Sequence, residues 1–214
     1  GGFTDILTIG LGTIGTTYSY LFSKAGHNVE HYIRKSSKKI NITELNVDML
    51  DGRNNKKGDH YTDTYKVNTH TKDNYDFIFI SMPAGNIESF IETLNSNNIK
   101  GTIILCCGIW EDKKYLEKVM QGREYILGYP VAGGNIVDAT LTCCVFDHFI
   151  LEKKENSKID NYDKLVKLFE SCNIKLETPY DMLEWIWLHM AINAGVVSIA
   201  AKYADMDNPT EAAE

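Results

Sequence analysis

Three glycines near the start of the chain have the spacing of a turn that holds phosphate groups. The apolar segment 6–9 leads into Gly10, and Gly12 and Gly15 follow in the pattern G-x-G-x-x-G. The first glycine permits the sharp bend, the second lets a pyrophosphate approach the backbone, and the third lets the next helix pack against the sheet. Free N–H groups at the start of that helix attract the anion. We predict a dinucleotide-binding turn, the alternative being a purely structural one, formed by Gly10, Leu11, Gly12, Thr13, Ile14 and Gly15.

The residues after the second expected strand indicate which dinucleotide would bind. Proteins that prefer NAD usually end this strand with an acidic residue that binds the ribose hydroxyls. Here the strand runs into Arg34 and Lys35, and the nearest acid, Glu30, lies in its middle. Basic side chains pair with the 2′-phosphate of NADP, whereas a carboxylate would repel it. The pattern favours NADP(H), with Arg34 and Lys35 as contacts; the alternative is a basic loop that is only solvated.

These residues need a sheet to hold them, and the pattern of the first 128 residues predicts one. Apolar runs alternate with segments of helical periodicity, and the run at 75–80 is almost continuously apolar. Such a run is typical of a parallel strand covered on both faces, and the alternation is typical of a Rossmann-type, doubly wound α/β sheet. Expected strands are 4–10, 28–33, 75–80, 102–106 and 125–127, with one or two more between 40 and 68, and expected helices are 13–25, 86–94 and 111–121.

Beyond residue 128 the pattern changes. We expect a glycine-bearing substrate loop or turn at 130–135, antiparallel strands at 139–148 and 149–153, a helix at 160–172, a strand at 174–177 and a long helix at 180–204. Pro179 suits the first turn of that helix. The helix is apolar on most sides, so we expect it to be buried. We therefore predict an NADP-binding domain over residues 1–178 and, over 179–214, the start of an all-helical domain that is cut off or completed by a partner.

The composition is that of a globular protein and argues against several partners. Hydrophobic residues make up 43% and charged residues 24% of the 214 residues, and the formal net charge is −7. An acidic balance without a basic block argues against nucleic acid. No apolar run approaches the length that crosses a bilayer. The five cysteines lack the spacing of metal ligands, so we expect buried reduced thiols in a cytoplasmic protein and no metal site.

Four segments of the chain together resemble the ketopantoate reductase family of NADPH-dependent oxidoreductases. They are the glycine turn, the segment that begins Ala25-Gly26-His27-Asn28-Val29 and continues to Arg34, the tetrapeptide Ser81-Met82-Pro83-Ala84, and the helix from Trp185 to Ala194. The resemblance follows the order of the whole chain, although members of the family are longer. It implies NADPH-dependent reduction of a small 2-oxo acid or related carbonyl compound in an interdomain cleft. We also expect a homodimer formed through the helical domain.

The resemblance assigns site residues, several of which depart from the family pattern. The position of the family's catalytic lysine holds His189, and the asparagine one turn later is kept as Asn193. A family lysine after the fourth-strand apolar run is replaced by Pro83, and the asparagine of an Asn-Gly turn is replaced by Cys107. These replacements put activity on ketopantoate itself in question. The residues expected at the cofactor in this region are Met82, Pro83, Cys107 and Gly108.

His189 and Asn193 lie four residues apart and therefore share one face of a helix. Reduction of a ketone places a hydride on carbon and a proton on oxygen. Histidine can supply that proton near neutral pH, while Asn193 holds the substrate's hydroxyl or carbonyl group. The alternative for His189 is a core histidine bonded to the backbone. Two other functions stay open: reductive condensation of an amino acid with an oxo acid, as in opine-type dehydrogenases, and an inactive NADP(H)-binding sensor.

Overall fold

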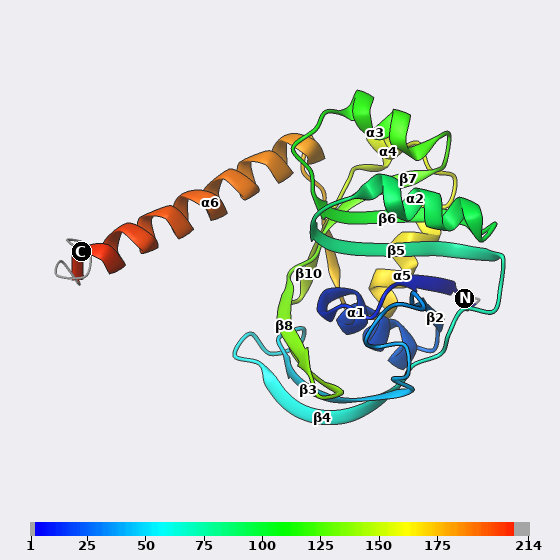
Figure 1. Cartoon of the computed structure of the whole chain (residues 1–214), viewed down its shortest axis with the longest axis horizontal. Helices are drawn as coiled ribbons and strands as arrows, with labels where there is room; N and C mark the ends of the chain where they lie inside the picture. The colour runs from blue at the N-terminus through cyan, green and yellow to red at the C-terminus, as the bar shows by residue number, and fades with distance from the viewer. Residues whose placement is uncertain (1–2, 208–214) are drawn as a thin grey trace.

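A computed structural model describes residues 3–207 and has a seven-stranded sheet at its centre (Figure 1). The strand order is β11-β10-β7-β6-β5-β1-β2, and neighbours are parallel except for the antiparallel pair β10 and β7. The strands are β1 (Asp5–Ile9), β2 (Asn28–Tyr32), β5 (Asn74–Ala84), β6 (Lys100–Gly108), β7 (Tyr125–Tyr129), β10 (His148–Leu151) and β11 (Lys175–Glu177).

This sheet confirms the predicted Rossmann-type, doubly wound architecture. The chain runs from β1 outward to β2, then crosses to β5 on the other side of β1 and continues outward through β6 and β7. The strand order therefore reverses between β1 and β5. In open sheets of this kind, ligands bind beyond the carboxyl ends of the strands at the point of reversal. The glycine turn follows β1 directly and thus lies at that point.

Helices cover both faces of the sheet. Successive residues of β5 face opposite sides: Phe79 belongs to a cluster with Phe22 and Phe169, and Ile78 belongs to a second cluster with Ile91. The first cluster contains α1 and α5, and the second contains α2 and α3. The helices are α1 (Thr13–Lys24), α2 (Ile87–Ser96), α3 (Lys113–Met120), α4 (Lys154–Ser157) and α5 (Tyr162–Ser171). The sequence does not predict α4, because this helix has only four residues and none of them is buried, so it shows no apolar periodicity.

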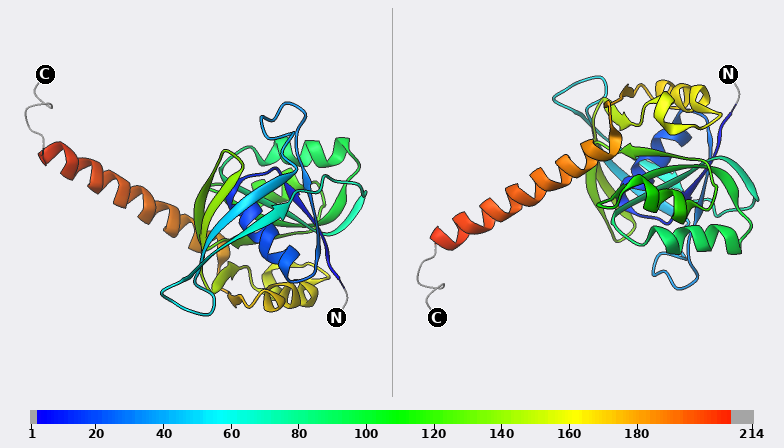
Figure 2. Two further views of the ribbon diagram at one scale, coloured as in Figure 1. Left: turned by 90° about the horizontal axis from the view of Figure 1, so that it is seen from below. Right: turned by 90° about the horizontal axis from the view of Figure 1, so that it is seen from above.

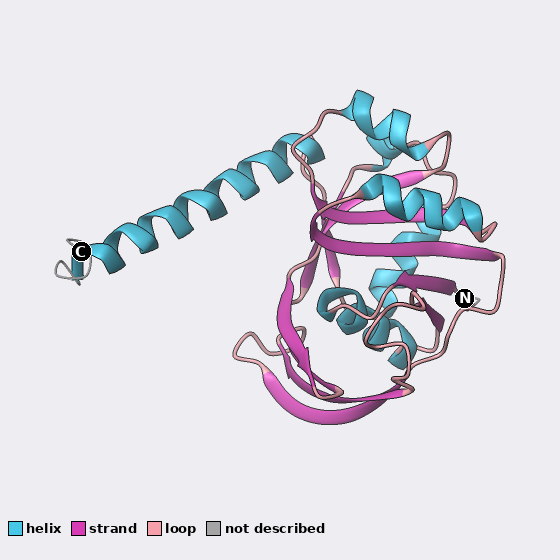
Figure 3. Cartoon of the chain, viewed as in Figure 1, coloured by secondary structure: helices cyan, strands magenta, loops and turns pink. Residues whose placement is uncertain are grey.

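A second, four-stranded sheet packs on α1 from the side opposite the large sheet (Figure 3). Its strand order is β4-β3-β9-β8. Along β3, buried and more exposed residues alternate, and the buried Leu45, Val47 and Met49 join the cluster that contains α1. The strands are β3 (Glu44–Asp51), β4 (Asp59–Lys66), β8 (Ala132–Val137) and β9 (Thr140–Val145). Because α1 lies between two sheets, the turn at its start is held from both sides.

The segment 130–153 differs from its prediction. Residues 130–135, expected to form a loop or turn, lie largely in β8, which pairs with β9. β9 and β10 each have an antiparallel neighbour, as expected, but they belong to different sheets: β9 lies between β8 and β3, and β10 lies between β7 and β11. Local sequence indicates a strand, whereas the partner of a strand depends on packing against residues far away in the chain.

The last helix, α6 (Met182–Asp207), leaves the sheet and projects away from it (Figure 2). Its first turns are packed, since Met182 and Ile186 are buried, but Leu188 and Ile192 farther along are exposed. Among residues 3–207 no segment covers these exposed positions, so burial of the helix stays a prediction that depends on the further helical domain or partner expected here. The helix begins at Met182, slightly later than the expected start at 180, so Pro179 lies before its first turn. The side chain of Asp181 caps it by accepting a hydrogen bond from the Glu184 N–H at 3.1 Å.

Candidate nucleotide and carbonyl site

The glycine turn has the geometry that an approaching phosphate requires. Gly10 has a φ of 82°, in the left-handed region, and its N–H donates to the Tyr32 carbonyl at 2.7 Å, which joins the turn to β2. A Cβ on Gly12 would meet no atom within 4 Å, so the backbone there is open. A Cβ on Gly15 would lie 3.0 Å from the Thr8 side chain, so this glycine lets α1 pack against β1. Each glycine lies where its expected role needs it.

The N-terminus of α1 adjoins this opening and has no side chain that caps it. Gly12 is the N-cap residue, and the first turn contains no acidic residue. The first helical hydrogen bond runs from the Thr16 N–H to the Gly12 carbonyl at 2.9 Å, so the preceding N–H groups have no acceptor within the helix. These donors and the helix dipole favour an anion. The turn therefore fits the pyrophosphate of a dinucleotide.

A buried histidine on β2 supports the glycine turn through a hydrogen bond. His31 on β2 is fully buried, and its Nδ1 donates a hydrogen bond to the Gly10 carbonyl at 2.8 Å. Its Nε2 lies 2.7 Å from the Tyr65 hydroxyl on β4. Burial lowers the pKa of His31, more than the bond to Gly10 raises it. The ring is thus neutral, Nδ1 carries the proton, and Nε2 accepts from Tyr65.

The acid nearest to the turn is already engaged elsewhere. The Glu30 carboxylate accepts hydrogen bonds from the Tyr75 hydroxyl at 2.6 Å and from the Thr71 N–H and hydroxyl at 2.9 and 2.7 Å. Burial raises the pKa of Glu30, but these hydrogen bonds outweigh the effect and lower the pKa below its usual value. The charged carboxylate ties β2 to the segment before β5, so it is not free to bind ribose hydroxyls.

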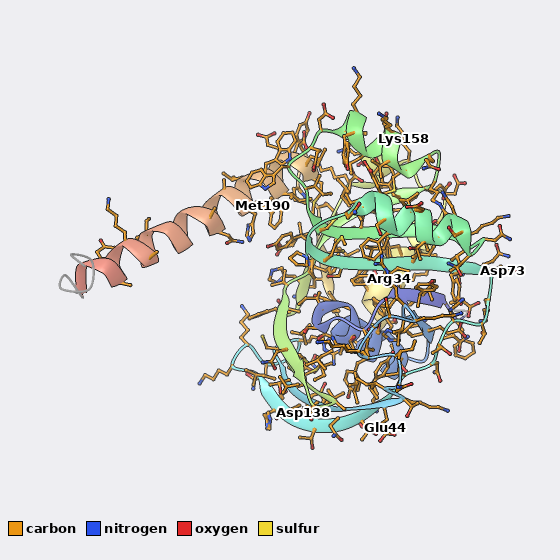
Figure 4. The ribbon with its side chains drawn as sticks, viewed as in Figure 1. Arg34, Glu44, Asp73, Asp138, Lys158 and Met190 are labelled. Atoms are coloured by element: carbon orange, nitrogen blue, oxygen red, sulfur yellow. The ribbon has the colours of Figure 1, made fainter. Side chains whose placement is uncertain are left out.

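The two predicted basic contacts lie on the surface beyond β2. Arg34 and Lys35 are exposed. Nη2 of Arg34 donates to the Ser89 hydroxyl at 3.0 Å, and its guanidinium lies 5.5 Å from the centroid of the Phe90 ring. Both partners belong to α2, so Arg34 reaches across the edge of the sheet; Figure 4 labels it near the middle of the molecule, away from Met190 on α6.

Lys39 also reaches the glycine turn, although the sequence analysis does not single it out. Its Nζ donates a hydrogen bond to the Leu11 carbonyl at 2.9 Å. The signal that could have found it is the basic run 34–39, which reads RKSSKK and of which we predicted only the first two residues as contacts.

A cavity of about 700 Å³ opens at the carboxyl ends of β5, β6 and β7, next to the glycine turn. Of the predicted site residues, its walls contain Gly12, Thr13, Ile14, Met82, Pro83, Cys107, Gly108 and Asn193. The predicted residues outside its walls are Gly10, Leu11, Gly15, Arg34, Lys35 and His189. Pro130 and Ala132, from the segment 130–135 expected as a substrate loop or turn, also line the cavity. The lining residues that were not predicted are Ser81, Cys106, Trp110, Tyr129 and Met190. Most of these lie at or just after the end of a parallel strand, which is the signal that could have found them.

The floor of the cavity is tightly packed around Gly108. A Cβ on Gly108 would lie 2.6 Å from the Pro83 carbonyl oxygen and 3.1 Å from the Met190 side chain. Glycine is therefore required where β6 ends beside β5. Burial raises the pKa of Cys107 to about 12 and that of Cys106 well above its usual value. Both thiols are neutral near pH 7, so neither provides a charged nucleophile.

The two residues predicted to do chemistry differ in position. Asn193 lines the cavity directly. His189 stacks on Trp185, with ring centroids 4.5 Å apart and an interplanar angle of 13°, and its ring lies 5.0 Å from that of Tyr129. Tyr129 lines the cavity, whereas His189 does not line it and instead contacts Tyr129. None of the described residues that line the cavity is charged.

The strand reversal, the open glycine turn and the adjoining cavity define a Rossmann-type α/β protein with one cleft at its switch point. The sequence profile of the family described as ketopantoate reductase PanE/ApbA matches residues 6–129, more than half of the chain. The chain therefore belongs to this family, as its sequence resemblance implies. No curated protein matches it in sequence.

Solved structures share the fold at low sequence identity. A 2-dehydropantoate 2-reductase from Geobacter metallireducens GS-15 has 15% identity and a TM-score of 0.64, covering 88% of this chain and 62% of its own. A dimeric ketopantoate reductase from Staphylococcus aureus has 15% identity and a TM-score of 0.65, covering 95% and 66%. A D-mandelate dehydrogenase, solved with NADH and anilino(oxo)acetate, has 15% identity and a TM-score of 0.58, covering 82% and 57%.

The chain spans about three fifths of the length of the first of these structures. Their likeness establishes the fold, with α6 as its last described element. Within residues 3–207, no helix is both long and apolar enough to cross a bilayer.

Proposed function

We propose that the protein is an NADP(H)-dependent oxidoreductase that reduces a small 2-oxo acid or a related carbonyl compound. One observation carries this proposal: Gly12, Thr13 and Ile14 of the glycine turn line the same cavity as Asn193 of α6. A dinucleotide with its pyrophosphate on the turn would place its reactive end in this cavity, where a substrate can meet it. The neutral, largely apolar walls would also exclude water from the reaction.

The preference for NADP(H) over NAD(H) rests on charge. Glu30 is held by Tyr75 and Thr71, while Arg34 and Lys35 after β2 are exposed. An arginine can bind a 2′-phosphate with two parallel hydrogen bonds. In this structure Arg34 contacts Ser89 and Phe90, which places its guanidinium beside α2. From there the guanidinium could also stack on a planar ring of the bound dinucleotide.

Bound NADPH would supply the hydride for the carbonyl carbon. The protein's own task is then to hold the carbonyl group and to deliver a proton to its oxygen. Asn193, in the cavity wall, would donate a hydrogen bond from its amide to that oxygen. His189, next to Tyr129, would supply the proton, directly after a small shift of the Tyr129 ring or through its hydroxyl.

The proposal is tested by the oxidation of NADPH, followed by absorbance, with ketopantoate and a panel of 2-oxo acids. Each reaction is run with and without amino acids, since turnover that requires an amino acid would instead indicate opine-type reductive condensation. Equal binding of NADH and NADPH would overturn the cofactor preference.

A second candidate is an inactive NADP(H)-binding sensor. The uncharged walls of the cavity and the position of His189 behind Tyr129 favour it. A sensor would bind NADPH tightly, turn over no substrate and keep its affinity in His189→Gln. An enzyme would lose turnover in the same variant.

We also propose the division into a nucleotide domain over residues 1–178 and a helical domain that begins at 179. Leu188 and Ile192 are exposed on α6 and provide an apolar face through which two copies could associate. Light scattering of the purified protein over a range of concentrations tests this association.

A further inference from the structure

The segment that follows β2 is an ordered loop with a basic edge. Between Arg34 and Lys39 it carries four basic residues and no acid. Hydrogen bonds fold it into consecutive turns: the Ser37 N–H donates to the Arg34 carbonyl at 2.9 Å, and the Lys39 N–H donates to the Ser37 hydroxyl at 3.2 Å. These turns bring Lys39 back toward the strand end from which Arg34 departs.

Two apolar side chains anchor this loop next to Lys39. Ile40 and Ile42 both pack against the cluster that contains α1, and the Ile42 N–H donates to the Lys39 carbonyl at 3.0 Å. Lys39 therefore extends from a backbone that is held on the core. Its half-buried side chain reaches the Leu11 carbonyl, between the first and second glycines of the turn.

The position of Lys39 corresponds to the adenosine side of the turn. The Gly10 N–H is bonded to the Tyr32 carbonyl, so the start of the turn and the end of β2 are adjacent. In Rossmann folds, the adenosine ribose lies beside the end of the second strand, while the pyrophosphate lies over the helix N-terminus. Lys39 and Arg34 both depart from the loop after that strand. The Lys39 ammonium has three N–H donors, and the Leu11 carbonyl takes only one of them.

We propose that Lys39 binds the 2′-phosphate of NADP(H) together with Arg34 and is a determinant of the preference for NADP(H) over NAD(H). This inference rests on the proposed function. Lys39 keeps one hydrogen bond to the turn and directs the other two donors at the phosphate, while Arg34 approaches from the start of the same loop, where it contacts Ser89 of α2. Two cations from the two ends of this loop suit a group that carries close to two negative charges.

The inference is tested by calorimetric titration of the purified full chain with 2′,5′-ADP and with 5′-AMP, two probes that differ only in the 2′-phosphate. The test variant is Lys39→Met, which keeps much of the aliphatic stem and removes the charge. Lys38→Met is the matched control, because it removes one charge from the neighbouring, exposed position of the same loop. Thermal unfolding without ligand checks that both variants fold.

We expect Lys39→Met to weaken 2′,5′-ADP binding about tenfold or more, the effect of losing one hydrogen bond to a charged group, and to change 5′-AMP binding less than about twofold. Lys38→Met should change both less than about threefold, and Lys39→Arg should restore most of the loss. Equal weakening of both probes by Lys39→Met would show that Lys39 acts on the turn or the pyrophosphate, and would overturn the inference.

The wild-type protein separates this inference from the proposed function. If it binds 2′,5′-ADP no better than 5′-AMP, the NADP(H) preference fails and the role of Lys39 fails with it. If the wild type discriminates and Lys39→Met discriminates equally well, only the role of Lys39 is overturned. A Lys39→Met variant with a lowered unfolding temperature and unchanged discrimination would give the lysine a structural role alone.

Discussion

Nδ1 of His31 donates a hydrogen bond to the Gly10 carbonyl at 2.8 Å, and this bond joins the end of β2 to the first residue of the glycine turn. The opposite side of the ring accepts from Tyr65, on β4 of the second sheet. One side chain therefore connects both sheets to the turn that is expected to bind phosphate. Gly10 has a left-handed backbone conformation and no side chain that could restrict it. The hydrogen bond from His31 therefore helps to set the orientation of the turn.

Replacement of this histidine should lower stability and loosen the turn. His31→Leu removes two buried hydrogen bonds, to the Gly10 carbonyl and to the Tyr65 hydroxyl, so we expect a loss of about 2 kcal/mol in the free energy of unfolding. Urea denaturation measures it. His148→Leu is the control, since His148 is only half-buried and pairs with Asp147 at the surface; it should cost less than about 0.5 kcal/mol. Similar losses in both variants would contradict a special role for His31.

Stability should also depend on pH through His31. Burial lowers the pKa of His31 in the folded protein, so below about pH 6.5 the unfolded chain binds a proton that the folded chain does not. The stabilising contribution is therefore fully present above about pH 6.5 and is lost as the pH falls toward the lower folded-state pKa. Burial lowers the pKa of His27 as well, so both residues contribute.

Urea denaturation at about pH 7.5 and at about pH 5.5 measures this dependence. The wild-type protein should lose more stability between the two than His31→Leu does. Equal losses would show that His31 does not take part in the pH dependence.

Two glycine-to-alanine changes should separate folding from binding. A Cβ on Gly12 meets no protein atom, so Gly12→Ala should cost at most about 1 kcal/mol of stability, as expected at an N-cap, but should weaken NADPH binding severely. A Cβ on Gly108 would lie 2.6 Å from backbone oxygen, so Gly108→Ala should cost about 1–3 kcal/mol.

Gly133→Ala is the control for both, because the nearest atom to its Cβ is a sulfur at 3.8 Å. Thermal unfolding and titration with NADPH measure the two effects. Unchanged NADPH affinity in Gly12→Ala would place the nucleotide elsewhere.

The catalytic prediction concerns α6. His189→Ala should lower turnover by about 10²-fold or more, the scale of general acid catalysis, while NADPH affinity stays nearly constant. Asn193→Ala should raise KM and lower kcat, because the amide would orient the carbonyl group. Lys202→Ala, at an exposed position farther along α6, should have little effect on turnover or on NADPH affinity. Loss of folding in His189→Ala, seen by thermal unfolding, would instead make His189 a core residue that packs on Trp185 and Tyr129.

The sequence determined those features that depend on residues close together in the chain. The spacing of Gly10, Gly12 and Gly15 predicted the turn, because its bend, opening and helix contact are all made within a few residues. The apolar run at 75–80 predicted a buried parallel strand, since both of its faces must be covered. The order of such elements was then sufficient for the fold class.

Tertiary structure alone decided which distant segments meet. Residues 130–135 are predicted as a loop or turn, yet pairing with β9 holds most of them in the strand β8. His31 and Tyr65 are far apart in the chain, and only the packing of two sheets around α1 joins them at Gly10. Lys39 reaches Leu11 because Ile40 and Ile42 hold its loop on the core. Such contacts depend on how whole layers pack, and no local periodicity encodes that.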